Sequence, residues 1–578
     1  MSRKYKKKLR KYSYQPNTVR IDDEIIGIVI KKNKNSVSII PVDRKIRKVF
    51  KIKNQNKAVK IDDLVRIKKN TKEEVDRFNI ELIETNALYK PLSNISVHKN
   101  KIPYEWPDNV IEELKEIKNF NTVDREDLTS IPLITIDGAD AKDFDDAVWA
   151  KKTENGEWHL IVAIADVSFY VQPNSSLDKE ALKRGNSTYF PDQVIPMLPE
   201  LLSNNLCSLI EDRKRPCLAV HIYINHLGEI IKYNFSRAVI KSKARLTYEQ
   251  VQSAYDGKSE DVPKEFLADI IRPLYEVYEI LHQNRVKRGS LELEILEKKI
   301  MINNSNKSIS VKNVRKYKSH KIIEELMITA NIAAAMELSL KETPSIYRIH
   351  EKPDSEKLKL IDKIFDSYNL GLSKKKNITP QDFNKILNLD TNLSDILIKN
   401  LILRSQSQAK YNNENFGHFG LGISHYTHFT SPIRRYSDLM VHRQLLNQYK
   451  NIELENYETN NKEIADYISF TERRSVDAER ETYDRYVAKL LFKKKGSIFK
   501  SYINGLNTFG VFITLEKFGG DGFIPIRYLP ADYYDFFDND TSLSGRNNGL
   551  TLKIGDRINS QLIEANPKNG RLIFRFSA

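Results

Sequence analysis

The sequence predicts a multidomain protein in which a large mixed α/β body lies between two small β-barrels. Three observations lead to this fold class. Short strand-like runs separated by turn residues fill residues 18–90, strand-like and helical runs alternate across residues 121–450, and five glycine-broken strand-like runs fill residues 496–578. With 578 residues, of which 40% are hydrophobic, the chain has room for about four domains and a large core.

The net charge favours a polyanion as partner. Lys and Arg together number 93 against 77 Asp and Glu, which gives a formal net charge of +16. Length and composition exclude a peptide, a fibre or a disordered tail. Nucleic acid is therefore the leading candidate for the ligand.

Cysteine usage and hydropathy point to the cytoplasm. Cys207 and Cys217 are too few for a disulfide framework, and their spacing does not match a zinc site. No apolar run approaches the roughly 18 residues that span a bilayer, and the basic start SRKYKKKLRK leads into a polar segment rather than into the apolar part of a signal peptide. We expect a cytoplasmic protein without membrane contact.

The N-terminal part divides into a tail, a barrel and a linker. Residues 1–17 form a strongly basic tail, which we expect to be disordered and either to bind phosphate or only to aid solubility. The runs EIIGIVI, NSVSIIPV, KVFKIK and KIDDLVRIK predict a small β-barrel over residues 18–90. Residues 91–120 form a proline-containing linker with a short helix at 109–118.

The central body contains the clearest strand and helix. Residues 158–167 (WHLIVAIADV) are nearly all apolar and predict a buried strand, whereas residues 320–342 have helical spacing with a small-residue face. Residues 451–495 hold a long, charged helix that closes the body. Its many opposite-charge pairs four residues apart suggest that most of it is a solvated strut.

The last segment has the size of an OB barrel. Its five runs are SIFKSYINGL, TFGVFITL, DGFIPI, DRINSQLIEA and RLIFRFS. Phe509, Phe512 and Phe523 would lie partly on the open face, where each stacked base contributes about 1–3 kcal/mol. The alternative, that they belong to the core, is equally compatible with the pattern of any one of them.

An acidic cluster is the strongest chemical signal. Residues 137–146 (DGADAKDFDD) lie between the apolar stretches IPLITI and AVWA, so the carboxylates sit at the edge of a buried region and require compensating cations. The five carboxylates are Asp137, Asp140, Asp143, Asp145 and Asp146. A solvated loop without a metal is the structural alternative.

The spacing of the acids favours magnesium over calcium. An EF-hand requires acids at loop positions 1, 3 and 5, Gly at 6 and Glu at 12, and the cluster lacks that order. Two Mg²⁺ ions about 3.5–4 Å apart, bridged by a phosphodiester, would use four of the acids. We assign Asp137, Asp143, Asp145 and Asp146 to this metal site.

An arginine follows a predicted helix start in HFTSPIRRYSDLMVHRQL. Ser431 is suited to the N-cap and Pro432 to the first helical position, which would place Arg434 in the first turn. A helix N-terminus and a guanidinium both favour anions, so the pattern predicts a phosphate contact. Arg435 competes for this role, and a surface arginine beside a cap is the alternative.

Four histidines surround this segment without forming a zinc motif. They are separated by seven, three and fourteen residues, and we expect them to pack or to contact RNA. The residues are His418, His425, His428 and His442.

Several motifs together identify a resemblance. TIDGADAKDFDDA, VAIADVS, RGNSTYFPDQVIPMLPELLSNNLCSL, HKIIEELMITANIAAA, YRIHEKP and HFGLGISHYTHFTSPIRRYSDLMVHR resemble the ribonuclease II / ribonuclease R (RNB) family of 3′-to-5′ exoribonucleases, in particular its bacterial ribonuclease R members. The resemblance implies an N-terminal cold-shock-type OB barrel, a central RNB catalytic domain and a C-terminal S1-type OB barrel. It also implies Mg²⁺-dependent, processive hydrolysis of single-stranded RNA with a free 3′ end to nucleoside 5′-monophosphates, in RNA turnover.

The resemblance carries roles to individual residues. It implies that Asp145 and Arg434 are catalytic, with Arg434 on the scissile phosphate, and that Tyr189 stacks on the terminal base. Tyr248 and Glu324 resemble the pair that reads the terminal sugar. Glu479 falls where the family has an acid near the leaving nucleotide, in a gapped alignment, and we assign it to the catalytic residues.

Departures from the family pattern are also visible. Leu293 occupies a position that usually carries an aromatic partner of the stacking tyrosine. The N-terminal region fits one cold-shock unit where two are usual, and no lysine-rich tail follows the last barrel. These two features bring the handling of structured RNA into question.

Rival interpretations concern activity rather than fold. One is a catalytically weak RNA-binding or scaffold protein of the same fold, against which the complete set of acids and Arg434 argues. Another, a cation-stabilised protein of a different class, does not account for two flanking barrels. We expect a monomer, with the ribosome or other RNA-decay factors as possible partners.

Overall fold

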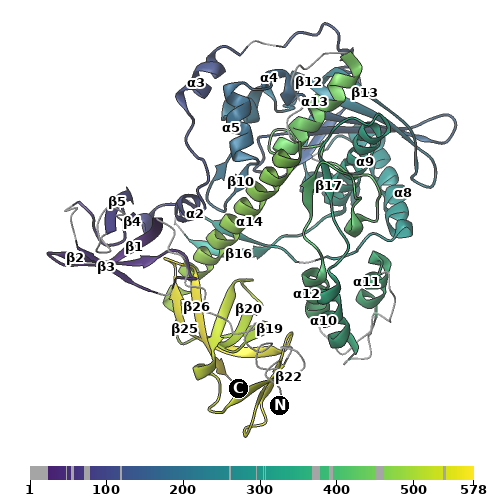
Figure 1. Cartoon of the computed structure of the whole chain (residues 1–578). Helices are drawn as coiled ribbons and strands as arrows, with labels where there is room; N and C mark the ends of the chain where they lie inside the picture. Colours follow the sequence, from purple (N-terminus) through teal and green to yellow (C-terminus); the bar gives the residue numbers. More distant parts are fainter. Residues whose placement is uncertain are drawn as a thin grey trace, which may run out of the picture.

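The computed structural model describes residues 24–577 apart from short gaps at 47, 54–57, 70–77, 118–119, 259–261, 295, 304, 306–307, 367–377, 390–394, 451–460 and 538–541. The predicted basic tail lies outside the described residues. Figure 1 shows three bodies: an N-terminal sheet in purple, a central domain in blue to green, and a C-terminal barrel in yellow.

The N-terminal body is a five-stranded antiparallel sheet in the order β3-β2-β1-β4-β5. Its strands are β1 (Glu24–Lys32), β2 (Ser36–Pro41), β3 (Phe50–Lys53), β4 (Leu64–Lys69) and β5 (Phe78–Glu84). The outer strands curl toward each other, because the rings of Phe50 on β3 and Phe78 on β5 lie 5.9 Å apart. In the described residues the predicted small barrel is an open half-barrel, since β3 and β5 are not paired. Its strand β5 was not revealed by the sequence pattern.

Both faces of β1 are buried. Ile25 and Val29 belong to the core of the sheet itself. Ile26 and Ile28 belong to a different core, shared with the end of a long helix and with the C-terminal barrel. The N-terminal sheet is therefore packed into the rest of the molecule. Two helices, α2 (Ser93–Lys99) and α3 (Asp108–Lys115), then lead to the central domain.

The central domain is built on a seven-stranded sheet in the order β14-β7-β8-β9-β12-β13-β6. Its strands are β6 (Glu126–Asp127), β7 (Ile134–Asp137), β8 (Asp146–Lys152), β9 (Trp158–Ala165), β12 (Lys214–Ile224), β13 (Ile230–Lys241) and β14 (Ala244–Thr247). On β9, Leu160 and Val162 face one hydrophobic core whereas Ile161 and Ala163 face another. A strand buried on both faces is apolar throughout, which explains the run WHLIVAIA.

Helices cover both faces of this sheet. They are α4 (Val167–Tyr170), α5 (Ser176–Arg184), α6 (Tyr248–Tyr255), α7 (Lys264–Phe266), α8 (Arg272–Arg288), α9 (Lys318–Leu340) and α13 (Tyr436–Lys450). Three further helices, α10 (Ser355–Asp366), α11 (Pro380–Leu387) and α12 (Asp395–Ser405), pack on one another in a separate cluster. The short pairs of strands are β10 (Thr188–Tyr189) with β11 (Val194–Ile195), β15 (Lys298–Ile302) with β16 (Ile309–Asn313), and β17 (Tyr347–Ile349) with β18 (Lys410–Asn412). The predicted mixed α/β body is confirmed.

The C-terminal body is a closed barrel in the order β19-β20-β21-β26-β25. Its strands are β19 (Ile498–Asn507), β20 (Gly510–Leu515), β21 (Asp521–Pro525), β25 (Arg557–Asn566) and β26 (Arg571–Ser577), which are the five predicted runs. A three-stranded sheet is inserted between β21 and β25. It consists of β22 (Tyr534–Phe537), β23 (Ser542–Gly545) and β24 (Thr551–Lys553).

The long helix α14 (Asn461–Leu491) joins the three bodies, and Figure 1 shows it crossing the molecule to end between the two barrels. The interpretation of a mainly solvated strut is wrong, because buried residues occur along α14 from Ala465 to Leu491. The opposite charges that suggested solvation in fact bind neighbouring domains.

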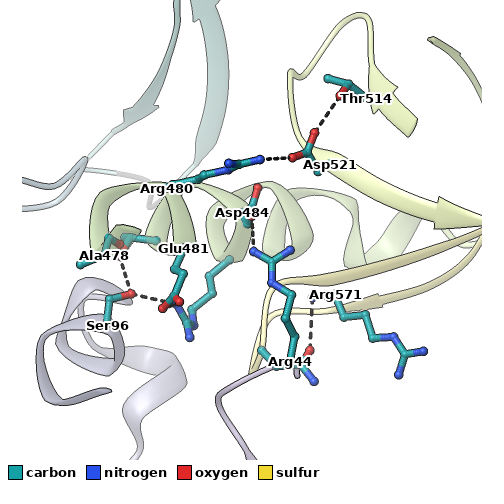
Figure 2. A network of polar contacts seen from close by, with 12 residues as sticks. Arg44, Ser96, Ala478, Arg480, Glu481, Asp484, Thr514, Asp521 and Arg571 are labelled. Atoms are coloured by element: carbon teal, nitrogen blue, oxygen red, sulfur yellow. Dashed lines mark hydrogen bonds and ion pairs between the residues drawn. The ribbon is translucent and has the colours of Figure 1, made fainter. Parts of the chain in front are cut away.

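Figure 2 shows this network at the C-terminal half of α14. Asp484 forms an ion pair with Arg44 of the N-terminal sheet. Arg485 is 1% exposed and donates to Ser96 Oγ of α2 at 2.8 Å. On the other side, Arg480 donates to Asp521 Oδ2 of the C-terminal barrel at 2.6 Å. One helix therefore fixes both flanking bodies to the central domain.

Candidate active site

The acidic cluster forms the connection between two strands of the central sheet. Asp137 is the last residue of β7 and Asp146 the first of β8, so the other acids lie on the loop between these antiparallel strands. The backbone of Phe144 holds this loop to its neighbours: its N–H donates to Ser208 Oγ at 3.0 Å, and its carbonyl accepts the N–H of Leu209 at 3.0 Å. Because β7 and β8 are neighbouring strands, this arrangement brings the first acid of the cluster, Asp137, close to the last, Asp146.

Arg245 on β14 also holds the acidic loop. Its Nη2 donates to the carbonyl oxygens of Gly138 at 2.8 Å and Ala139 at 3.0 Å. Its guanidinium lies 5.4 Å from the centroid of the Phe144 ring. Sequence reasoning missed this residue, although it lies in ARLTY, the motif quoted for Tyr248. The only sequence signal was its place in that motif, because its partners are backbone atoms.

Asp145 and Arg434 lie side by side. Asp145 is 4% exposed, and its Oδ1 accepts the backbone N–H of Ile433 at 2.9 Å. The Nε of Arg434 is 3.6 Å from Asp145 Oδ2. Burial raises the pKa of Asp145 well above its usual value, and the Arg434 guanidinium and the Ile433 N–H oppose this rise. Two segments far apart in sequence thus meet at one carboxylate.

Arg434 lies in a separate turn before helix α13, which begins at Tyr436, so the predicted helix start is wrong. In this turn the Ser431 carbonyl accepts the N–H groups of Arg434 at 3.3 Å and Arg435 at 3.0 Å. The β-bridge between Arg435 and Asn186 separates the turn from the helix. The Arg434 side chain is 43% exposed and can reach a ligand.

Asp137 and Asp146 are coupled electrostatically. Burial raises the pKa of Asp137, against the hydrogen bond from the N–H of Gly138 at 2.8 Å. Burial, followed by the charge of Asp137, raises the pKa of Asp146 to about 7. Several carboxylates are therefore held where their charge is unfavourable. This is the environment in which a bound cation would be stabilised.

The carboxylate oxygens of the loop are suitable ligands for a hard divalent ion, although the acids do not converge on one point. In the part of the chain that the structure describes, no group of three or more His, Cys, Asp or Glu residues has the arrangement of a metal site. Carboxylate oxygens at this loop are the ligands that Mg²⁺ prefers. Which of the four acids would hold an ion stays a prediction.

Tyr189 connects the acidic loop to α14. Its hydroxyl donates to Asp143 Oδ2 at 3.1 Å, and its backbone N–H donates to Glu479 Oε1 at 2.7 Å. Burial raises the pKa of Glu479, and the Tyr189 N–H opposes this rise. Tyr189 is 41% exposed, so its ring is open to a ligand beside the acids.

Tyr248 approaches the acids from the other side. It is the first residue of α6 and follows Thr247, whose side chain caps the helix by accepting the N–H of Gln250 at 3.1 Å. Thr247 is paired with Asp137 in the parallel β14–β7 ladder. Burial and then the charges of Asp137 and Asp146 raise the pKa of the Tyr248 hydroxyl. The register of two strands therefore places Tyr248 at the acidic cluster.

Comparison with known proteins identifies two domains. The RNB domain model matches residues 125–451, and the S1 RNA binding domain model matches residues 493–577. The chain belongs to the RNB family. Its RNB domain holds every acid described above together with Arg434 and both tyrosines, whereas Glu479 follows the matched segment.

Proteins named ribonuclease R are similar to most of the chain. The chain is 36% identical to ribonuclease R of Vibrio parahaemolyticus over 93% of its own length and 67% of that protein. It is 36% identical to ribonuclease R of Escherichia coli over 86% of its length and 63% of that protein. The chain thus spans about two thirds of the length of these relatives.

Solved RNB structures have the same architecture. Mycoplasma genitalium RNase R, in complex with ribose-methylated single-stranded RNA, superposes with a TM-score of 0.88 at 28% identity, covering 96% of this chain and 90% of that one. Yeast Ssd1, described as a pseudonuclease, superposes with a TM-score of 0.69 at 17% identity, covering 90% of this chain and 67% of that one. The second likeness shows the fold alone. The predicted arrangement of a central RNB domain between OB-type barrels is confirmed.

Two residues predicted at the RNA terminus lie further along the RNB domain. Glu324 on α9 is 51% exposed, and its Oε1 accepts Arg285 Nη1 at 3.0 Å. Leu293 packs against the hydrophobic cluster formed by helices α10 to α12. Its described packing is with this cluster, and its pairing with Tyr189 stays a prediction.

The S1 domain presents aromatic rings to solvent. Phe509 is 55% exposed and Phe512 is 42% exposed. The ring of Phe512 lies 4.9 Å from that of Phe523, which is partly buried on the neighbouring strand β21. These exposures favour the base-stacking alternative for Phe509 and Phe512 over a purely core role.

The histidines mainly pack. His442 is fully buried and its Nε2 lies 2.8 Å from the Phe429 carbonyl oxygen. His428 Nδ1 lies 2.9 Å from the Tyr411 hydroxyl, and His418 Nδ1 accepts the N–H of Leu421. His425 contacts Ser424 at the surface.

Proposed function

We propose that this chain is a processive 3′-to-5′ exoribonuclease that hydrolyses single-stranded RNA to nucleoside 5′-monophosphates. The observation that carries the proposal is the contact between buried Asp145 and partly exposed Arg434, inside a family whose named relatives are ribonucleases R. A buried acid beside an exposed guanidinium offers one group for the reaction and one for the phosphate.

In the proposed reaction, a water oxygen loses a proton and forms a bond to the phosphorus that links the last two nucleotides. The bond from phosphorus to the 3′ oxygen of the preceding nucleotide breaks, and this oxygen takes up a proton. When bound, Mg²⁺ would be held by the acids at positions 137, 143, 145 and 146 and would supply positive charge to the phosphate oxygens. The chain's own residues must orient the RNA terminus for this attack.

Each residue of the proposed site has a distinct task. Arg434 contacts the non-bridging oxygens of the scissile phosphate. Tyr189, fixed by Glu479 through its backbone N–H, presents its ring to the terminal base. Tyr248 and Glu324 contact the terminal ribose. Together they hold a free 3′ end in one orientation, and holding the reacting groups in the right geometry lowers the barrier.

The substrate class follows from charge and from the barrels. A net charge of +16 favours a polyanion. Exposed Phe509 and Phe512 on the S1 domain support capture of unpaired bases, for which an OB-type face is suited. We propose single-stranded RNA with a free 3′ end as substrate, with RNA turnover as the cellular role.

The proposed place of action is the cytoplasm, and the proposed oligomeric state is a monomer. Cys207 and Cys217 are free thiols in the structure, as in a reducing compartment. Among the described residues, no helix is long and apolar enough to cross a membrane.

A second candidate function is RNA binding without hydrolysis. The fold is compatible with it, since yeast Ssd1, described as a pseudonuclease, has the same fold. The presence of Asp137, Asp143, Asp145 and Asp146 together with Arg434 favours the enzyme.

The test uses the full chain with a 3′-labelled single-stranded RNA, in Mg²⁺ and in EDTA. We expect labelled mononucleotide from the first time point in Mg²⁺ and no product in EDTA. A 3′-phosphate should slow or block the reaction, because the terminal ribose site requires a free hydroxyl. Internal fragments at early times would contradict an exonuclease, and tight binding without any product would favour the second candidate.

A further inference from the structure

A stacked pair of rings joins two elements at the edge of the proposed site. The ring of His320, on α9, lies 3.9 Å from the ring of Tyr248, on α6, and the two planes differ by 14°. A hydrogen bond links the same elements, since Ser319 Oγ donates to the Tyr248 carbonyl at 2.8 Å. Both the backbone and the ring of Tyr248 are thus fixed from α9.

His320 is itself held in one orientation. Its Nδ1 accepts the backbone N–H of Tyr317 at 3.2 Å, in the first turn of α9. Burial lowers the pKa of His320, which favours the neutral ring. A neutral ring that accepts at Nδ1 carries its proton on Nε2. The imidazole therefore offers Tyr248 a rigid flat surface rather than a mobile charged one.

Through the residue before it, Tyr248 is also connected to the acidic loop. Thr247, directly before it, is paired with Asp137 across β14 and β7. Glu324 lies four residues after His320 on α9, so these two side chains project from the same face of the helix. His320 therefore contacts one of the two residues proposed to bind the terminal ribose and shares a helix face with the other.

We propose that His320 is a positioning residue, which holds the ring of Tyr248 so that the site distinguishes the sugar of the 3′-terminal nucleotide. This inference rests on the proposed function of Tyr248 and Glu324 as ribose contacts. Without the imidazole, one face of the Tyr248 ring loses its support and the hydroxyl no longer has a single direction. Discrimination between a ribose and a 2′-deoxyribose terminus then falls.

The test compares His320→Leu, which removes the flat ring, with His320→Phe, which keeps a ring of similar thickness but not the acceptor. The control is His282→Leu. His282 on α8 is partly buried and is stacked on Tyr278 with a 5.5 Å centroid distance, and it has no assigned part in the site. Thermal unfolding of all variants reports any general loss of stability.

Affinity is measured in EDTA for two RNA oligonucleotides that differ only in their last sugar, ribose or 2′-deoxyribose. We expect wild type and His282→Leu to prefer the ribose terminus. The preference should fall by about twofold to tenfold in His320→Leu, the size of an aromatic pair contribution, and should be largely retained in His320→Phe.

Each result separates the two proposals. An unchanged preference in His320→Leu, an equal loss in His282→Leu, or no preference in wild type would overturn the role of His320. Because binding is measured without hydrolysis, a wild-type protein that shows the expected preference but releases no nucleotide in Mg²⁺ would contradict the proposed enzyme while supporting the inference.

Discussion

Glu479 on α14 accepts the backbone N–H of Tyr189 at 2.7 Å, so the helix that joins the three bodies also touches the proposed site. The interaction is made by one carboxylate oxygen with a backbone group. The hydrogen bond therefore requires an acceptor oxygen on the side chain of residue 479, whereas the negative charge matters much less.

This geometry gives a prediction for Glu479. Glu479→Gln keeps an acceptor and should retain kcat within about threefold of wild type, whereas Glu479→Ala should lower it by about tenfold, the equivalent of 1.4 kcal/mol. Single-turnover hydrolysis of a short RNA measures the effect. An equally large loss in both variants would mean that the carboxylate acts as an acid or base rather than through Tyr189.

The second prediction concerns Asp145. Asp145→Asn keeps an oxygen that can accept the Ile433 N–H, so the fold and RNA affinity should stay close to wild type. Turnover should fall by several orders of magnitude, because stabilisation of the transition state is lost while phosphate contacts persist. The measurements are kcat, RNA affinity and melting temperature.

A matched control lies in the same loop. Asp140 is 90% exposed and its described partner is Lys299 at 3.6 Å. Asp140→Asn should leave kcat within about twofold of wild type, because exposed ion pairs contribute little. A large effect of Asp140→Asn, or retained turnover in Asp145→Asn, would contradict the assignment of the acids.

The third prediction concerns capture by the S1 domain. Phe509→Ala and Phe512→Ala should each weaken binding of long single-stranded RNA by about 1–3 kcal/mol, the contribution of a base stacked on an aromatic ring. The dependence of affinity on salt should not change, since no charge is removed. Tyr533→Ala is the control, because Tyr533 is 76% exposed and lies in the inserted sheet region. An equal effect of Tyr533→Ala would argue against a specific stacking face.

The fourth prediction concerns a buried ion pair that does not include the acids of the loop. Asp166 is fully buried and accepts Arg125 Nη2 at 2.8 Å, Arg237 Nε at 3.1 Å and Ser168 Oγ at 2.6 Å. Asp166→Asn should lower the free energy of unfolding by about 3–5 kcal/mol, because two guanidiniums lose their counter-charge. Chemical denaturation at neutral pH measures this difference.

Acid unfolding provides an independent check of Asp166. Burial by itself would raise the pKa of Asp166, but Arg237 and Arg125 outweigh it and the pKa is lowered. The resulting stabilisation is present above the unfolded-state pKa of about 3.9 and is lost as the pH falls through the lower native value. The loss of stability between about pH 5 and pH 2 should therefore be smaller in Asp166→Asn than in wild type.

Much of the fold could be predicted because apolar patterns are local. The run at Trp158–Ala165 and the small-residue face of α9 each indicated their element, and the five C-terminal runs correspond to the barrel strands. The inserted sheet β22–β24 was missed because its segment is rich in Asp, Asn, Ser and Gly, which mark loops more often than strands. The start of α13 was misplaced because a β-bridge from Asn186 to Arg435, distant in sequence, overrides the local capping signal.

The part of the site with an unusual density of charged residues could be predicted from the sequence. Side chains that contact backbone atoms or the face of a ring could not. The acids at positions 137–146 are conspicuous in sequence. Arg245, which donates to two carbonyl oxygens of that loop, and His320, which acts through a ring face, have partners that no local pattern identifies. The role of α14 was misjudged for a related reason, since its charges resemble a solvated surface until their partners in other domains are known.

The shared core described at β1 has a consequence for how the protein is made. Ile26 and Ile28 are buried in a cluster that also contains Tyr486, Leu491 and residues of the C-terminal barrel. Ala87, Leu92 and Ile95, which follow the sheet directly, belong to the same cluster, but most of its other members lie on α14 and on the C-terminal barrel. On a translating ribosome the sheet emerges before both of these elements. Its apolar face is therefore covered completely only after α14 and the barrel have been synthesised.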